Sequence, residues 1–144
     1  MKLVMLLLMG LTLSTLETPT PWLTDYDVAL VKAKEEDKPI LLSFTGSDWC
    51  KPCIMLTREV FEDQAFQDYA LKNLVLLQAD FPRLKKNKLS AEQTEQNESL
   101  AAKFNKTGEF PLVVLLNAKG EVIAKTGYQK GGAEHFINYL KGVL

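Results

Sequence analysis

The stretch Phe44-Thr-Gly-Ser-Asp-Trp-Cys-Lys-Pro-Cys53 contains the only two cysteines of this 144-residue chain. Two residues separate Cys50 from Cys53. The pair follows an aliphatic run, Pro39-Ile-Leu-Leu-Ser-Phe44, and precedes a segment whose apolar residues recur at helical spacing. A C-x-x-C pair between a strand and a helix is typical of a redox-active dithiol. The sequence therefore predicts thiol–disulfide chemistry at this position.

The length and charge of the chain narrow the range of partners. A chain of 144 residues suits one domain that buries about two-thirds of its unfolded surface, so it needs no disulfide framework. This favours a chemical role for the cysteines. The 17 basic and 18 acidic residues give a net charge of -1, which offers no electrostatic basis for binding nucleic acid or an anionic membrane. We expect proteins and small thiols as partners.

The chain begins with one positive charge and an apolar run, Met1-Lys-Leu-Val-Met-Leu-Leu-Leu-Met-Gly-Leu-Thr-Leu13, that is too short to span a bilayer core of ~30 Å. We predict a signal peptide over residues 1–17, with its cleavage site left open, and one domain over 18–144. After processing, no stable membrane insertion is expected. Export places the dithiol in an oxidising compartment, where a redox partner must maintain its state.

The remaining sequence alternates between helical and strand patterns. Apolar spacing and capping residues predict helices at 25–37, 51–59, 63–71, 90–104 and after 131, and strands at 40–44, 74–80, 112–116 and 121–126. The last two strands form a hairpin around Asn117-Ala-Lys-Gly120. Right-handed crossovers require the first strands to be parallel. The pattern therefore predicts an α/β fold with a mixed sheet and helices on both faces.

Two polar features have an ordinary and a functional interpretation. The basic segment Phe81-Pro-Arg-Leu-Lys-Lys-Asn-Lys-Leu89 is either a docking patch or a solvated loop, and we favour the loop because acidic residues follow it directly. His135, the only histidine, lies far along the chain from the cysteines. We expect it to have a surface or capping role.

Two motifs together carry a family resemblance. Trp49-Cys50-Lys51-Pro52-Cys53 stands between the predicted strand and helix, and Gly108-Glu-Phe-Pro111 precedes the predicted hairpin. This combination resembles the thioredoxin-fold superfamily, and most of all its secreted bacterial thioredoxin-like branch, with the motif F-x-G-S-D-W-C-x-x-C. The resemblance covers about residues 22–144. It implies a thioredoxin-like fold with a central sheet of about four to five strands, and a periplasmic location.

The resemblance also implies roles for individual residues. Cys50 would be an exposed nucleophile and Cys53 the resolving thiol. Pro111 would be a cis-proline facing them, and the backbone of Phe110 would pair with an extended substrate. Trp49 either packs beside the dithiol and shields it or is an ordinary core aromatic.

The residue types around the dithiol suit the activation of a thiol. Only a thiolate attacks a disulfide, and the positive end of a helix starting at Cys50 stabilises that charge. The adjacent Lys51 adds to this effect. Pro52 fits the first helical turn, where its missing N–H leaves no hydrogen bond unmade.

One feature of the family is missing from this chain. Relatives often carry a buried acid on the strand before the motif, which assists proton removal from the resolving cysteine, but Ser43 and Phe44 occupy the candidate positions here. A lysine that partners this acid in thioredoxin is absent as well, since Leu76 and Gln78 stand in its neighbourhood. We expect proton transfer at Cys53 to be slower or mediated by water.

Three functions compete for these residues. We favour a monomeric thiol–disulfide oxidoreductase without further cofactor, acting as a reductase or in general exchange on protein disulfides or dithiols, together with an upstream redox partner. The alternative is a redox-inactive binding or folding module with a structural Cys50–Cys53 disulfide, which would gain little from so short a loop. A zinc site is disfavoured because closed sites need about four ligands, and the chain has two cysteines and one remote histidine.

Overall fold

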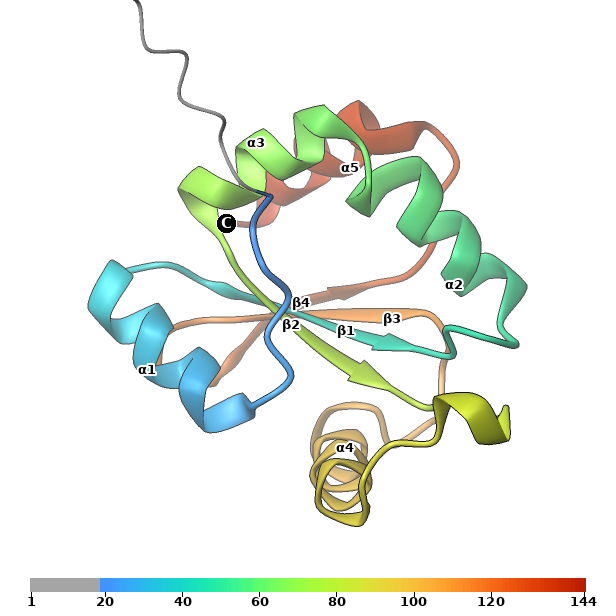
Figure 1. Cartoon of the computed structure of the whole chain (residues 1–144). Coiled ribbons are helices and arrows are strands. Elements are labelled where there is room, and N and C mark those ends of the chain that lie inside the picture. Colours follow the sequence, from blue (N-terminus) through green and yellow to red (C-terminus); the bar gives the residue numbers. More distant parts are fainter. Residues whose placement is uncertain (1–18) are drawn as a thin grey trace, which may run out of the picture.

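A computed structural model of the chain describes residues 19–144, so the signal peptide predicted over residues 1–17 lies outside the described part. Helices and strands alternate along the chain (Figure 1). The helices are α1 (Tyr26–Glu36), α2 (Lys51–Leu56), the π-helical turn η1 (Thr57–Phe61), α3 (Gln64–Asn73), the short 3-10 turn η2 (Lys85–Asn87), α4 (Ala91–Phe104) and α5 (Gly132–Val143). The strands are β1 (Ile40–Thr45), β2 (Val75–Asp80), β3 (Leu112–Leu116) and β4 (Val122–Thr126).

The four strands form one mixed sheet in the order β2-β1-β3-β4. Strand β1 runs parallel to β2 and antiparallel to β3, and β4 pairs with β3 as a hairpin. At the β2 edge, Leu23 adds a single parallel bridge to Leu77. The predicted mixed sheet is confirmed, and its parallel and antiparallel halves are those that the sequence pattern required.

Side chains of the central strand β1 alternate between two hydrophobic cores. Leu41 packs in the core beneath α3 and α5, whereas Leu42 and Phe44 pack in the core beneath α1 and α4. Figure 1 shows these two pairs of helices on opposite faces of the sheet. Because both faces are covered, all six residues of β1 are buried, and four of them are apolar. The strand that leads to the cysteines is therefore held firmly in place.

The helix predicted over residues 51–59 has a different form in the structure. Its α-helical part ends at Leu56, and the chain continues through the π-helical turn η1. The turn buries both Val60 and Phe61, and the Phe61 ring lies 5.0 Å from Trp22 and 6.0 Å from Phe136 between ring centroids. Three aromatic residues from distant segments thus stabilise a turn that local spacing does not predict.

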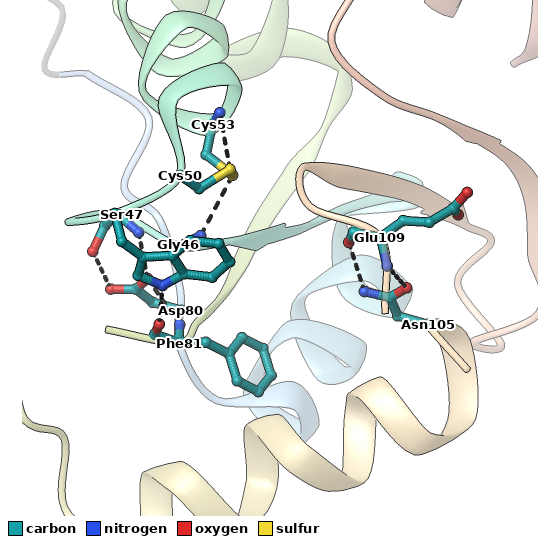
Figure 2. The surroundings of a disulfide bond; sticks show 9 residues. Gly46, Ser47, Cys50, Cys53, Asp80, Phe81, Asn105 and Glu109 are labelled. Atoms are coloured by element: carbon teal, nitrogen blue, oxygen red, sulfur yellow. Dashed lines mark hydrogen bonds between the residues drawn. A yellow bond between two sulfur atoms is a disulfide. The ribbon is translucent and has the colours of Figure 1, made fainter. Parts of the chain in front are cut away.

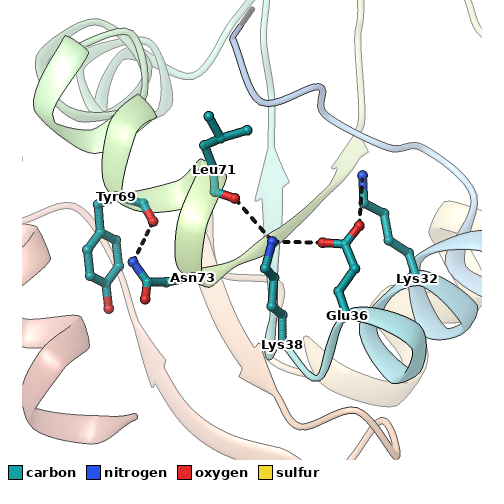
Figure 3. Close-up of polar contacts among 6 residues, drawn as sticks. All are labelled: Lys32, Glu36, Lys38, Tyr69, Leu71 and Asn73. Carbon is teal, nitrogen blue, oxygen red and sulfur yellow. Dashed lines mark hydrogen bonds and ion pairs between the residues drawn. The ribbon is translucent and has the colours of Figure 1, made fainter. Parts of the chain in front are cut away.

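A lysine joins the ends of two helices (Figure 3). The Nζ of Lys38 donates hydrogen bonds to Glu36 Oε2 at 2.7 Å and to the carbonyl oxygen of Leu71 at 3.1 Å. We expect Lys38→Met to lower the free energy of unfolding by about 1 kcal/mol, because the Leu71 carbonyl loses a charged donor. Chemical denaturation would measure the change. Lys106→Met, at an exposed position in the turn after α4, is the matched control and should leave stability unchanged.

Candidate functional site

The two cysteines form a disulfide at the start of α2. Cys50 is the N-terminal capping residue of this helix and Cys53 lies in its first turn, with a Cα–Cα distance of 5.2 Å. The backbone N–H of Cys53 donates to Cys50 Sγ at 3.3 Å (Figure 2). When the disulfide is reduced, this N–H and the helix start face the sulfur that becomes a thiolate. The predicted strand–dithiol–helix arrangement is confirmed.

The expectation that Cys50 is exposed is wrong for this disulfide form. Cys50 is only 4% exposed and Cys53 only 2%. In this form the Cys50 sulfur is bonded to Cys53 at the first turn of the helix. The outward surface of the motif consists instead of Lys51 and Pro52, which are both exposed.

Gly46 brings the backbone of the motif close to both Cys53 and Trp49. Its N–H donates to Cys53 Sγ at 3.5 Å. A Cβ atom at this position would overlap the Trp49 indole, so glycine is the residue that fits. Sequence reasoning did not assign Gly46 a role, although it lies inside the motif.

The indole of Trp49 connects the motif to two other loops. Its Nε1–H donates to the carbonyl oxygen of Phe81 at 2.7 Å, and its ring lies 5.5 Å from that of Phe110. The Arg83 guanidinium lies over the Trp49 ring, 3.7 Å from the ring centroid. Two predicted site residues, Trp49 and Phe110, are therefore in contact.

The peptide bond between Phe110 and Pro111 is cis, as the resemblance implied. Pairing of Phe44 with Leu112 places Pro111 at the end of the sheet where the motif leaves β1. The preceding loop is held by Asn105, which is only 4% exposed. Its Nδ2 donates to the Glu109 carbonyl and its Oδ1 accepts from the Glu109 N–H, both at 2.9 Å (Figure 2).

Comparison with known proteins agrees with this geometry. The family model described as Thioredoxin-like matches residues 21–118, about two-thirds of the chain, including the motif and the cis-proline. The chain belongs to the thioredoxin-like family.

Two proteins of Chlamydia pneumoniae and one solved structure are similar to this chain. This thioredoxin-like chain is 36% identical over 119 residues to disulfide bond reductase DsbH of Chlamydia pneumoniae, covering 83% of this chain and 70% of that protein. It is 33% identical to thioredoxin-related protein DsbJ of the same organism, covering 88% of this chain but only 38% of that protein. A solved structure of DsbH oxidoreductase superposes with a TM-score of 0.80 at 34% identity, covering 88% and 85% of the two chains. The predicted fold and the predicted class, a thiol–disulfide oxidoreductase, are confirmed.

Two aspartates brace the thioredoxin-like motif against the loop after β2. Asp80 accepts hydrogen bonds from the N–H and the hydroxyl of Ser47, at 3.0 and 2.6 Å. Asp48 accepts from the N–H groups of Arg83 and Leu84, at 2.9 and 3.0 Å, and from Asn87 Nδ2 at 3.0 Å. The basic segment predicted as a solvated loop is thus exposed but anchored beside the site.

Acid is expected to release this loop. The backbone N–H of Arg83, followed by the amide of Asn87, holds the pKa of Asp48 below its ordinary value of 3.8. The pKa of Asp48 is lower in the folded state than in the unfolded chain. The hydrogen bonds that the Asp48 carboxylate accepts are therefore complete above its ordinary pKa, and they are lost as the pH falls through its folded-state pKa. In a Trp22→Phe background, Trp49 fluorescence should therefore change below about pH 4. Asp48→Ala should show at neutral pH the Trp49 fluorescence that the parent protein shows only in acid. If the acid transition were unaltered in this variant, Asp48 would not be the residue that holds the loop.

Other features of the thioredoxin-like domain lie apart from the site. His135 is exposed, and its Nε2 lies 3.0 Å from Gln129 Oε1, which agrees with the predicted surface role. Within residues 19–144, no three His, Cys, Asp or Glu side chains gather as a metal site would require. In the same range, no helix has the length and apolar character needed to cross a membrane.

Proposed function

We propose that this thiol–disulfide oxidoreductase acts as a reductase of disulfide bonds in other proteins. The observation that carries the proposal is the pairing of Cys50 and Cys53 across the first turn of α2, with backbone N–H groups directed at both sulfurs. The 36% identity to a protein named disulfide bond reductase supports the direction of the reaction.

The reaction begins with the reduced dithiol. The Cys50 thiolate attacks one sulfur of the partner's disulfide, forming a mixed disulfide and releasing the partner's other sulfur as a thiolate. The Cys53 thiolate then attacks Cys50 Sγ, the mixed disulfide breaks, and the Cys50–Cys53 bond forms. The partner gains two electrons and two protons, and an upstream dithiol later returns the pair to its reduced form.

The substrate binds along the loop that contains the cis-proline. A cavity of about 460 Å³ opens beside Phe110 and Pro111 and continues along the start of β3 and the end of β4. An extended peptide lying there would reach the backbone of Phe110 for hydrogen bonding. Trp49, in contact with Phe110, shields the dithiol on this side, and the exposed Lys51 and Pro52 form the rim.

The cellular setting follows from the N-terminal sequence and the relatives. Residues 1–17 act as a signal peptide, and residues 18–144 form a monomeric periplasmic domain that needs no cofactor besides its own cysteine pair. The hydrophobic N-terminal run and the origin of two similar proteins in the bacterium Chlamydia pneumoniae support this location. The substrates are exported proteins with exposed disulfides.

The reduction potential of the cysteine pair tests the proposal. Equilibration with glutathione or dithiothreitol buffers should give a value nearer to about -270 mV than to about -120 mV, as suits a reductase rather than an oxidant. A potential well below about -300 mV would instead identify an inert structural disulfide and the redox-inactive alternative. A reduction potential near about -120 mV would instead indicate that the protein oxidises dithiols in its partners.

A further inference from the structure

A second cavity lies on the inner side of the dithiol. It has a volume of about 410 Å³, and Cys53 is part of its wall. Strands β1 and β2 contribute Ser43 and Gln78, helix α3 contributes Gln67, and the segment before α1 contributes Thr20. The resolving cysteine, although it is only 2% exposed, therefore borders a space whose wall combines apolar side chains with several polar ones.

The segment before α1 closes this cavity along the edge of the sheet. The N–H of Leu23 donates to the Leu76 carbonyl at 2.8 Å, and the N–H of Gln78 donates to the Leu23 carbonyl at 2.9 Å. The Trp22 ring packs against Phe61 at 5.0 Å between centroids. These contacts fix Thr20 in the cavity wall.

Two buried oxygen atoms in the cavity wall lack a hydrogen-bond partner among the described residues. Thr20 Oγ1 and Gln67 Oε1 have no hydrogen-bond partner among residues 19–144, and Thr20 is only 8% exposed. An unsatisfied buried polar atom costs about 1–3 kcal/mol, and a cavity of this size with polar groups in its wall has room for several ordered waters. The wall is therefore built to bind water next to Cys53.

The resolving thiol of Cys53 needs a path by which its proton can reach solvent. The thiol must lose its proton before it can attack the mixed disulfide, and burial disfavours the charged form. The charged residues that line the cavity are Arg58 and Glu62, both exposed and both from the segment around η1. The lining residues from β1, β2, α3 and the N-terminal segment carry no acidic or basic side chain.

We propose that this cavity conducts the Cys53 proton to solvent through water bound by Ser43, Gln78 and Thr20. The proposal rests on the proposed function and concerns its second step. The Cys53 thiol transfers its proton to cavity water as its sulfur attacks Cys50 Sγ. The Cys50–partner bond breaks, the Cys50–Cys53 bond forms, and the partner leaves as a thiolate that takes a proton from solvent. Ser43, Gln78 and Thr20 act by positioning this water.

A two-phase release assay separates this step from the first. The reduced protein is mixed with a symmetrical nitrobenzoate disulfide, whose coloured thiolate is released once when Cys50 attacks and once more when Cys53 resolves. In Thr20→Val and Ser43→Ala we expect the second phase to slow about tenfold near neutral pH, with the first phase unchanged. The difference should shrink as the pH rises and Cys53 ionises without help. Ser43→Asp, which places a base in the cavity, should accelerate the second phase and extend it to lower pH.

Ser99→Ala, at an exposed position of α4 away from the dithiol, is the matched control and should behave like the parent protein. An unchanged second phase at every pH in all three cavity variants would overturn the proposal, as would an equal slowing of both phases. If the parent protein released no thiolate at all, the proposed function itself would fail. If both phases occurred and the cavity substitutions changed neither rate, only the proposed proton route would be rejected, and the proposed function would stand.

Discussion

Replacement of Cys50 by alanine is expected to abolish disulfide reduction, lowering the rate by roughly 10³-fold or more. Cys50 is the sulfur at the start of α2, where the N–H of Cys53 and the helix terminus stabilise its thiolate. Cys53 does not occupy this capping position, because it lies within α2 and borders the cavity on the inner side of the dithiol. The rate would be measured with a protein disulfide substrate and a chemical reductant in excess.

Cys53→Ala provides the complementary result. This variant should still attack its partners but fail to release them, so that mixed disulfides accumulate. Because the chain has only two cysteines, every covalent partner of this variant must be attached to Cys50. Trapping in the native host would therefore identify the substrates and the upstream redox partner. Recovery of no linked protein, or full activity of Cys50→Ala, would contradict the enzymatic function.

Asn105→Ala is expected to have the second-largest effect. The side chain satisfies both backbone groups of Glu109 in a buried position, and this loop leads directly into the cis-peptide bond of Phe110 and Pro111. Loss of both hydrogen bonds should lower the free energy of unfolding by about 2 to 4 kcal/mol. It should also raise the KM for a protein substrate, because the loop proposed to bind the substrate loses its anchor. Denaturant unfolding and steady-state kinetics measure the two effects.

Asn117 offers a matched control at the other end of β3. Its Oδ1 accepts from the N–H groups of Lys119 and Glu121, at 2.9 and 3.0 Å. Like Asn105, it is an asparagine side chain that holds the backbone of the loop that follows it. Asn117→Ala should reduce stability but leave the KM unchanged. If both variants altered the KM alike, the effect of Asn105 would be one of general stability and the substrate-loop assignment would be wrong.

The elements of the fold were predictable because local patterns determine them. Asp63 caps α3 and Ser90 caps α4, as their sequence positions indicated. The sequence Ser90-Ala-Glu-Gln93 has the pattern of a capping box, in which the Gln93 side chain would bond back to Ser90, but only half of this box is formed. Ser90 Oγ accepts from the Gln93 N–H, but the Gln93 amide donates to the Thr24 carbonyl and Asn97 Oδ1 instead. One of these acceptors, the Thr24 carbonyl, is 69 residues away along the chain, and no short pattern could indicate it.

The cysteines of the site were predictable from the sequence, but the hydrogen bonds that hold the motif in place were not. The spacing of Cys50 and Cys53 and their place between a strand and a helix were visible in the sequence. The bonds from Ser47 to Asp80 and from Asp48 to the loop after β2 join residues more than thirty positions apart. The only signal was that Ser47 and Asp48 belong to the quoted motif. The burial of Cys50 depends on tertiary packing and the disulfide, and residue spacing carries no information about either.

The pairing of Leu23 with β2 has a practical consequence for recombinant work on this protein. A chain that starts after Leu23 would lack Thr20 in the cavity wall, the aromatic contact between Trp22 and Phe61, and the bridge that covers the edge of β2, which would be left open to pairing with another molecule. Such a shortened protein would show aggregation and altered exchange kinetics that belong to the truncation and not to the enzyme. A purification tag is therefore better joined at Leu144, which is exposed beyond the end of α5.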